Sequence, residues 1–352
     1  MNVQQRSEER RNDRSGPTAT VPPSKSMWKR IVARYETPSL GRSVWQAAST
    51  IVSYGALWYL MHRSAAISYW MTLALAILGA GFLVRIFIIF HDCGHGSFFT
   101  SRKANDVLGA ITGLLIFTPY YRWRHEHAIH HATSGDLDRR GTGDVWTLTA
   151  QEYLASSRWK RFGYRLARNP VVLFGIAPLF LFVVLPRFPR RKADRRERNS
   201  VIWTDLGILG MAAALIALLG IKEYLLIQIS MMGMAGTVGV WLFYVQHQFE
   251  GVYWARRDEW DYVTAALQGS SYYRLPKVLQ WFTGNIGFHH IHHLSPGIPN
   301  YNLEKCHKAD PLLRGVAHIT LLGSFKSFSY RLWDEQRQTM VGFGDLRSLR
   351  RG

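Results

Sequence analysis

The sequence predicts an all-α integral membrane protein in which about four transmembrane helices carry a helical cytoplasmic cap. Two observations predict this class. Hydrophobic residues make up 47% of the 352 positions, but they are concentrated in a few long runs that basic segments separate. Ten of the fourteen histidines lie in three short clusters, HDCGHGS (91–97), HEHAIHH (125–131) and GFHHIHH (287–293). Histidine is a poor filler of an apolar core, so packing alone does not explain the clusters.

Four apolar runs have the length of a membrane crossing. The hydrocarbon core of a bilayer takes about 20 mostly apolar residues per helical crossing. We expect crossings at residues 45–61, 67–90, 201–220 and 224–246. The first run is short, but it contains Trp45, Trp58 and Tyr59, which are side chains that anchor a helix at the membrane interface.

Two weaker apolar runs, 107–119 and 171–185, are expected to lie in the membrane plane or to turn back. The first has 13 residues, which is too short for a crossing. The second contains Pro178 and stands between two basic segments, 121–169 and 187–200, of which the latter holds seven Lys and Arg residues. Since the positive-inside rule places both segments in the cytoplasm, residues 171–185 are not expected to cross once.

The remaining four crossings define the topology. They form two hairpins whose outer loops, 62–66 and 221–223, are short and hold one basic residue each. Both termini and all three histidine clusters are then expected on the cytoplasmic side of the inner membrane. We expect the membrane domain at residues 41–335, between a disordered basic cytoplasmic tail (1–40) and a basic C-terminal tail (336–352).

Composition excludes several other classes. The formal net charge is +19, but the basic residues flank apolar runs, so membrane topology explains the charge and no nucleic-acid partner is expected. The arginine-rich stretches 156–169 and 187–200 either lie against anionic headgroups or act only as topology determinants. Two cysteines, Cys93 and Cys306, supply neither a disulfide framework nor a cysteine-type zinc site.

The spacing of the histidines predicts that they converge. His91 and His95 are spaced i, i+4, so a helix presents both on one face. The other two clusters each contain a triplet spaced i, i+3, i+4, and one further histidine ends the fourth crossing. The expected set is His91, His95, His127, His130, His131, His247, His289, His292 and His293. His125 and His290 break the spacing and are expected beside the site or in solvent.

Nine imidazoles predict a site for two metal ions. Imidazole suits zinc, copper, iron and nickel, so ligand type does not choose the metal. A catalytic zinc takes about three protein ligands, whereas two ions with four or five ligands each fit the count. Such a site at a membrane surface suits O₂ reduction and an acyl chain as substrate. Ligating histidines usually donate their second N–H to a carboxylate or carbonyl. Asp92, Glu126, Asp136 and Asp138 are candidates for this role, and exposed salt bridging is the alternative interpretation.

Four stretches carry a resemblance to a known family. HDCGHGSFF, WRHEHAIHHATSGDLDRRGTGDVW and GNIGFHHIHHLSPGIPNYNL resemble the three histidine boxes of the membrane fatty acid desaturases, and YVQHQFEGVYW resembles the segment with their extra histidine. The resemblance spans about residues 40–330 and is strongest to bacterial acyl-lipid desaturases, relatives of the omega-3 and omega-6 group.

The resemblance implies an O₂-dependent desaturase that acts on acyl chains of membrane lipids with two iron ions (Fe²⁺/Fe³⁺). The iron ligands that it implies are the nine histidines of the expected set. No fused cytochrome b5 domain or Rossmann fingerprint occurs, so electrons are expected from a separate ferredoxin or flavodoxin-like protein.

The sequence also departs from related enzymes, and two alternatives stay open. Acyl-CoA desaturases have one more residue between the first two box histidines, and some place an asparagine near the metal where this chain has Phe243. Asn285, close to the third box, is a further candidate to support the ligands. The alternatives are a membrane hydroxylase on the same scaffold and a histidine-rich metal transporter. A transporter predicts a path of ionisable residues across the membrane, and Arg85, Asp205 and His247 are the residues that come near one.

Overall fold

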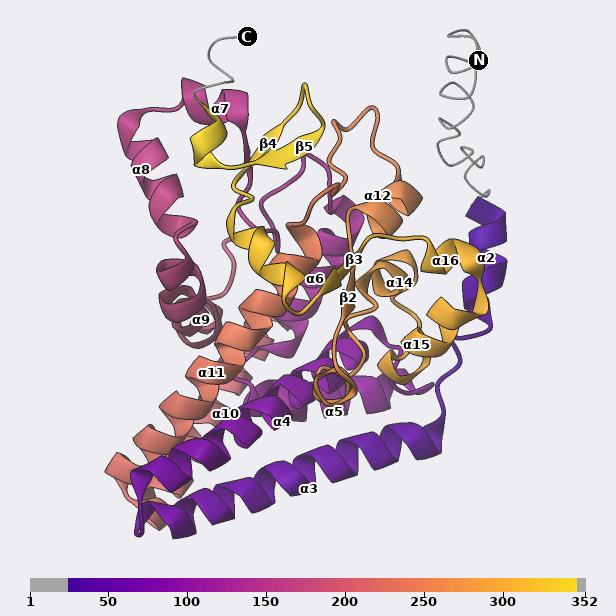
Figure 1. Cartoon of the computed structure of the whole chain (residues 1–352). Helices are drawn as coiled ribbons and strands as arrows, with labels where there is room; N and C mark the ends of the chain where they lie inside the picture. Colours follow the sequence, from indigo (N-terminus) through magenta and orange to yellow (C-terminus); the bar gives the residue numbers. More distant parts are fainter. Residues whose placement is uncertain (1–24, 347–352) are drawn as a thin grey trace, which may run out of the picture.

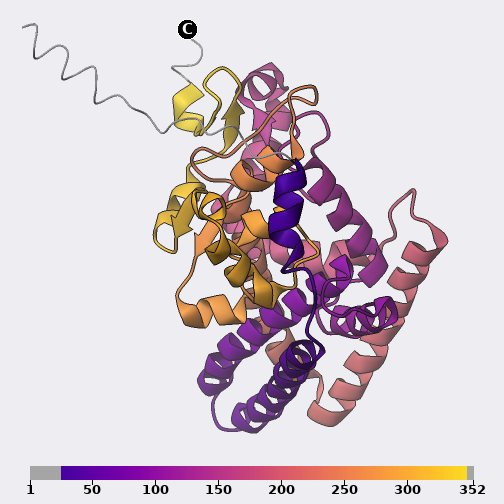
Figure 2. The ribbon, with the colours of Figure 1, turned by 90° about the vertical axis from the view of Figure 1, so that its right-hand side faces the viewer.

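Four long helices form the elongated part of the molecule (Figure 1). They are α3 (Leu40–Ala65), α4 (Tyr69–His95), α10 (Arg195–Leu219) and α11 (Ile221–His247). The structure is a computed structural model and describes residues 25–346 of the chain. α4 packs against both α3 and α11, and Figure 2 shows the hairpin of α3 and α4 foreshortened, in a view close to the helix axes. The four expected crossings correspond to these four helices.

Three of the helices, α4, α10 and α11, are long and apolar enough to cross a membrane, within the residues that the structure describes. The apolar window of α10 is only 6% buried inside the protein. Its side chains Trp203 and Leu209 are 71% and 66% exposed. Because burying apolar surface away from water is favourable, a helix with this surface is suited to contact with lipid.

α3 is similar in length but less apolar than the other three helices. Its polar residues face the protein. Ser43, Gln46 and Thr50 are buried, whereas Trp45 and Val52 on the opposite face are 74% and 70% exposed. A soluble helix has the reverse pattern. Polar residues toward neighbouring helices and apolar residues outward are the arrangement of a helix in lipid.

Of the two segments expected to lie in the membrane plane or to turn back, 107–119 falls largely in the regular helix α5 (Arg102–Leu115), and 171–185 is helical but irregular. Residues 171–185 fall in η1 (Val172–Ile176, a π-helix), α9 (Ala177–Leu179), η2 (Phe180–Val184, also π) and η3 (Leu185–Arg187). Pro178 lacks the amide hydrogen that a regular helix needs, which fits the alternation of π- and α-helical turns around it. Together with α8 (Arg158–Ala167) the segment forms a pair bent by 59°, which is either a broken span or a re-entrant segment.

The cap consists of short helices and two small sheets. Its helices are α5 (Arg102–Leu115), α6 (Tyr120–Thr133), α7 (Ala150–Ala155), α12 (Tyr262–Gln268), α13 (Lys277–Phe282), α14 (His289–Leu294), α15 (Asn300–Ala309), α16 (Pro311–Arg314) and the 3₁₀ helix η4 (Gly323–Phe328). β4 (Leu332–Asp334) pairs in parallel with β1 (Leu148–Thr149) and antiparallel with β5 (Thr339–Val341), and β2 (Tyr272–Arg274) pairs in parallel with β3 (His318–Thr320). The strands were not predicted, since two or three residues show no periodicity.

Parts of both expected tails are folded. Residues 25–33 form α2 (Lys25–Ala33), and Trp28 and Val32 of this helix are buried against the cap. At the other end, β5 and η5 (Phe343–Asp345) lie within the expected tail 336–352. The expected disorder was therefore wrong for residues 25–33, because a few apolar side chains in a polar stretch suffice to dock it on a core. Residues 1–24 and 347–352 lie outside the described part of the chain.

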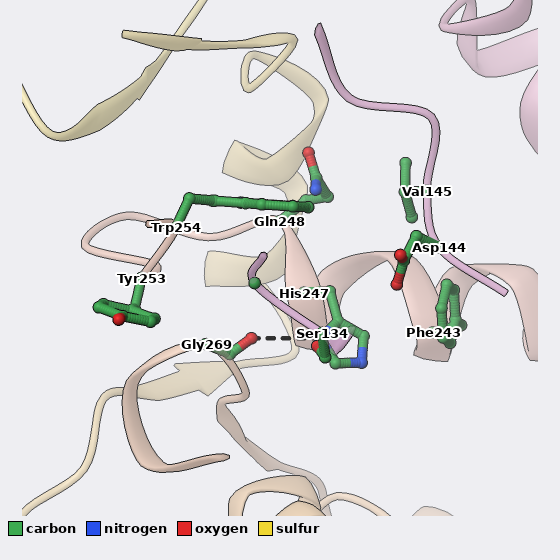
Figure 3. A pocket seen from close by; sticks show the side chains of 10 residues that line it. Ser134, Asp144, Val145, Phe243, His247, Gln248, Tyr253, Trp254 and Gly269 are labelled. Atoms are coloured by element: carbon green, nitrogen blue, oxygen red, sulfur yellow. Dashed lines mark hydrogen bonds between the residues drawn. The ribbon is translucent and has the colours of Figure 1, made fainter. Parts of the chain in front are cut away.

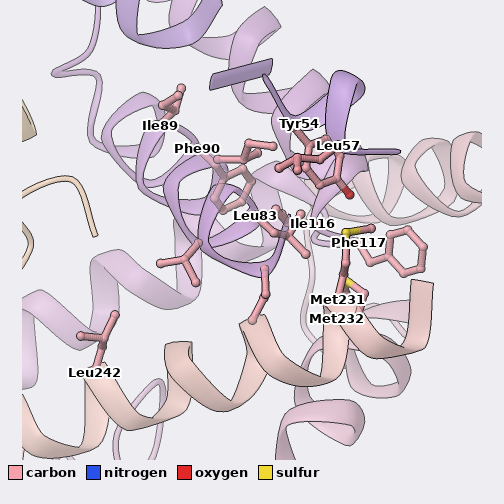
Figure 4. Close-up of a cluster of buried hydrophobic side chains, with 14 of the residues drawn as sticks. Tyr54, Leu57, Leu83, Ile89, Phe90, Ile116, Phe117, Met231, Met232 and Leu242 are labelled. Carbon is pink, nitrogen blue, oxygen red and sulfur yellow. The ribbon is translucent and has the colours of Figure 1, made fainter. Parts of the chain in front are cut away.

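The main core fills the space between α3, α4 and α11 (Figure 4). It includes Leu57 of α3, Leu83 of α4 and Met231 of α11. Protein interiors are closely packed, so this core fixes the positions of the helices that contribute to it. Since α4 ends at His95 and α11 ends at His247, the core also fixes where these histidines enter the cap.

Candidate metal centre

Four helices bring the nine expected histidines together. α4 contributes His91 and His95 from its last turns, α11 contributes its final residue His247, and α6 and α14 contribute three each. α4 stops directly after His95 because Gly96 adopts a left-handed conformation with φ of 73°. α14 has six residues, His-His-Ile-His-His-Leu, and all six are buried.

Five of the histidines form one group, which we call the five-histidine group. His91, His95, His127, His131 and His292 offer nitrogens that all lie within 4.8 Å of one another. The Nε2 atom of His292 lies 3.0 Å from that of His91 and 3.0 Å from that of His131. The Nε2 atoms of His131 and His127 are 3.1 Å apart. Nε2 of His95 is buried without a hydrogen-bond partner.

The other four form the four-histidine group. The nitrogens of His130, His247 and His293 lie within 4.8 Å of one another. Nε2 of His289 lies 3.0 Å from Nε2 of His247 and 3.2 Å from Nε2 of His293. Nε2 of His130 is buried and unpaired. The two groups are adjacent, since the rings of His131 and His293 stack with centroids 4.3 Å apart.

The nitrogen spacing fits metal ligation. Two nitrogens that bind one ion at about 2.1 Å lie about 3.0 Å apart at a right angle and about 3.4 Å apart in a tetrahedron. Burial and the neighbouring imidazoles lower the pKa of His127, His131, His292 and His293 well below its usual value, so these rings are neutral and present lone pairs. An all-imidazole set suits transition metals and not magnesium or calcium, which prefer oxygen ligands.

In three of the nine histidines, the Nδ1 atom, which faces away from the other histidines, is within hydrogen-bond distance of an acceptor. Nδ1 of His91 is 3.1 Å from Oδ1 of Asp92, and Nδ1 of His130 is 2.8 Å from Oδ1 of Asp144. Nδ1 of His247 lies 3.1 Å from the carbonyl oxygen of Gly269. An acceptor at Nδ1 places the proton there and leaves the Nε2 lone pair free to bind a metal.

Asp92 is the one carboxylate of the four expected candidates that contacts a histidine of either group, within residues 25–346. Glu126 pairs with Arg122, Asp136 with Arg139 and Asp138 with Arg256. Glu126 and Asp138, at 30% and 40% side-chain exposure, follow the alternative interpretation of exposed salt bridging, whereas Asp136 forms its salt bridge while fully buried. Asn285 accepts a hydrogen bond from Gln280 and donates one to the carbonyl of Asn300, so it is connected to the site through Asn300.

Asp144, Asn300 and Gly269 were not predicted. Asp144 lies in the loop after α6, and no fixed spacing connects a loop residue to a helical histidine. Asn300, the first residue of α15, donates from both its backbone nitrogen and its Nδ2 to Oδ2 of Asp92, at 2.7 and 2.8 Å. This contact joins residues 208 positions apart in the sequence. Gly269 contributes a main-chain carbonyl, which its residue type does not reveal.

The two histidines that break the spacing lie outside both groups. His125 is exposed. His290 is fully buried, and its Nε2 is 3.2 Å from Nδ1 of His307 and 3.2 Å from the carbonyl of Leu313. Solvent exposure, one of the two expectations for His290, is therefore wrong, because α14 is covered on that side by α15 and α16.

Aromatic side chains line the histidine groups. Trp123 stacks on His127 with centroids 4.3 Å apart, and a Cβ on Gly94 would lie 2.7 Å from the Trp123 ring. Phe243 packs against His130 at 5.2 Å between centroids. A cavity of about 10 Å³, near the size of one water molecule, lies beside the four-histidine group and is lined by Phe243, His247 and Asp144 (Figure 3).

Comparisons with known proteins agree with the residue pattern. The family model for fatty acid desaturases matches residues 67–318. A fatty acid desaturase of Bacillus subtilis is 47% identical over 318 residues, which cover 90% of each chain. A probable fatty acid desaturase of Sorghum bicolor is 30% identical and covers 81% of this chain and 76% of its own. The sn-1 acyl-lipid omega-3 desaturase (ferredoxin) of Synechocystis is 27% identical over 64% of this chain and 63% of its own.

Proposed function

Because this chain belongs to the fatty acid desaturase family, we propose that it introduces a cis double bond into an acyl chain of a membrane lipid, with O₂ as the oxidant. As a desaturase it is an oxidoreductase. In the proposed reaction a CH₂–CH₂ pair loses two hydrogens, and O₂ accepts these together with two electrons and two protons from outside. The products are one alkene and two water molecules.

We assign two iron ions to the nine histidines, one to each group. The observation that carries this assignment is the convergence of Nε2 atoms at 3.0–3.2 Å within two adjacent groups. When bound, the irons supply the oxidising power to remove hydrogen from an unactivated CH₂ group, which no side chain can do. The remaining features of the reaction depend on the residues of the chain.

The protein orients the ligands and keeps the site dry. Asp92, Asp144 and the Gly269 carbonyl accept the Nδ1–H of three histidines, which fixes the direction of each Nε2. Most of the ligands are buried, so bulk water is excluded from the reacting atoms. The rings of Trp123 and Phe243 offer an apolar surface against which an alkyl chain can lie next to the histidines.

We place the metal centre and both termini on the cytoplasmic side. α6, which carries three ligands, is tied to the basic segment that starts at Arg187. Arg122 of α6 donates hydrogen bonds of 2.6 Å to the carbonyls of Leu185 and Phe188. A segment with seven basic residues between 187 and 200 favours the cytoplasmic side. A basic surface there would suit an acidic electron donor, and we propose a ferredoxin or flavodoxin-like protein.

The test is fatty-acid analysis of the lipids of a bacterial host by gas chromatography and mass spectrometry. The host expresses the wild type or His130→Ala, together with a ferredoxin and its reductase, with and without O₂. We expect a new alkene that requires both the wild type and O₂. Derivatisation of the product locates the double bond.

Two results would contradict the proposal. A hydroxy acid in place of the alkene would identify a hydroxylase on the same scaffold. No product, combined with purified protein that contains no iron after iron-replete growth, would refute the metal assignment and favour a transporter. Counting metal ions per purified chain separates these cases.

A further inference from the structure

α8 presents two parallel stripes of side chains that differ in chemistry. Trp159, Phe162 and Leu166 are spaced i, i+3, i+7 and are 83%, 61% and 49% exposed. Arg158 and Arg161 begin a second stripe with the same spacing, one position earlier along the helix, which Arg165 completes. Because successive helical residues are about 100° apart, the cationic stripe runs directly beside the apolar one.

The arginine stripe lines an open cavity of about 760 Å³ between α8, α7 and η5. Tyr153 and Phe343 form aromatic walls, and the lining contains three arginines and no carboxylate. Arg165 is held in place, because its Nε donates to the Tyr153 hydroxyl at 2.6 Å and its guanidinium lies 4.8 Å from the Phe343 ring. Within residues 25–346, Arg158 and Arg161 form no ion pair with a carboxylate, so their charges are available to a ligand.

The apolar stripe of α8 continues into an exposed apolar surface on the segment that follows. After α8 the chain bends by 59°, and Val171, Ile176 and Phe180 on the following segment are 73%, 60% and 53% exposed. In Figure 1 α8 and α9 follow one another along one edge of the molecule, and α9 lies beside α11. A helix whose exposed aromatic and aliphatic residues flank a row of arginines matches the boundary between hydrocarbon and headgroups.

We propose that α8, α7 and η5 form a binding site for the phosphate-bearing headgroup of an anionic phospholipid. The arginines would contact the phosphate, since the planar guanidinium donates paired hydrogen bonds to phosphate oxygens. Trp159, Phe162 and Leu166 would lie against the acyl chains of the same lipid. This site is separate from the histidine groups and does not depend on the proposed chemistry.

The test measures lipid binding to the full-length protein in a neutral detergent. Native mass spectrometry is used to titrate phosphatidylglycerol and phosphatidylcholine against the wild type and Arg158→Gln/Arg161→Gln. The matched control is Arg191→Gln/Arg195→Gln, which removes two exposed arginines near the start of α10. Arg165 is left intact because its contacts support α7 and η5.

We expect the wild type to bind phosphatidylglycerol in preference to phosphatidylcholine. Each basic residue near an anionic lipid strengthens binding about fivefold, so the pocket variant should bind phosphatidylglycerol about 25-fold more weakly. The control should keep its preference. Equal losses of phosphatidylglycerol affinity in the pocket variant and the control would mean that general surface charge attracts the lipid. Unchanged affinity in both would also overturn the proposed site. Displacement of phosphatidylglycerol by an equal concentration of inorganic phosphate would identify a phosphate site instead of a lipid site.

Discussion

The two histidine groups differ in how the protein supports them. In the five-histidine group, Asp92 belongs to α4 itself, is 2% exposed and receives two hydrogen bonds from Asn300. Oδ1 of Asn300 accepts in turn from Nε2 of Gln46 on α3, at 3.1 Å. In the four-histidine group, the corresponding carboxylate is Asp144, which lies in a loop next to a water-sized cavity.

The difference teaches that the supporting carboxylate of one group is anchored between long helices, whereas that of the other lies in a loop of the cap. A buried carboxylate with several donors is costly to disturb, because each donor that loses its partner keeps its desolvation penalty. Asp144 lies beside a cavity, so a replacement there leaves fewer buried groups without a partner. Four experiments challenge or refine this comparison.

The largest effect is expected from removing a ligand of either group. His292→Ala and His130→Ala should abolish activity, because each deletes one of the four or five nitrogens available to an ion, while membrane insertion persists. His290→Ala is the matched control from α14 and should retain most of the activity. Activity is read from lipid fatty acids, and insertion from the amount of protein in the membrane fraction. Equal losses at His290 and His292 would contradict the ligand assignment.

The second experiment compares the two supporting carboxylates directly. Loss of a residue that orients a metal-bound histidine costs about 10- to 100-fold in metal affinity or activity. We expect Asp92→Ala near the upper limit, since it also leaves the amides of Asn300 unpaired, and Asp144→Ala near the lower limit. Iron per purified chain and the Mössbauer spectrum are the measurements. If Asp144→Ala lost as much iron as Asp92→Ala, the two carboxylates would support their histidine groups equally, which would contradict the comparison.

The third experiment probes the packing around the end of α4. Gly94→Ala places a Cβ 2.7 Å from the Trp123 ring and should lower the free energy of unfolding by about 1–3 kcal/mol. Gly96→Ala meets no atom within 4 Å, but its φ of 73° should cost about 1 kcal/mol. Thermal unfolding of the purified protein compares the two. A larger loss of stability for Gly96→Ala would show that the backbone conformation at the end of α4 contributes more to stability than the contact with Trp123.

The smallest effect is expected for Glu126→Gln. This carboxylate lies between His125 and His127 in the sequence, yet its side chain is 30% exposed and pairs with Arg122 at 3.3 Å. Partly exposed salt bridges contribute about 0–1 kcal/mol, so stability and iron content should hardly change. Iron analysis tests this, and a loss comparable to that of Asp92→Ala would place Glu126 in the metal site after all.

Local patterns in the sequence predicted which histidines converge, whereas long-range contacts escaped prediction. The spacings of His91 with His95 and of the two triplets follow from the geometry of a single helix, so one sequence suffices to find them. The long helices were likewise visible as apolar runs. The pairing of Asp92 with Asn300 depends on how α4 and α15 meet, and no local rule encodes it. The short strands and the docking of α2 through Trp28 depend on tertiary packing in the same way.

Because α4 ends in His95 and α11 ends in His247, the two histidine groups are attached to different helices that are themselves suited to cross the bilayer. Membrane helices adapt to bilayer thickness by tilting. α6 and α14 each supply histidines to both groups, so a change in the angle between α4 and α11 would move His91 and His95 relative to His247 while the shared helices hold the two groups together. The strain of a change in bilayer thickness would then fall on the ends of α4 and α11, where each long helix passes its histidines to the cap.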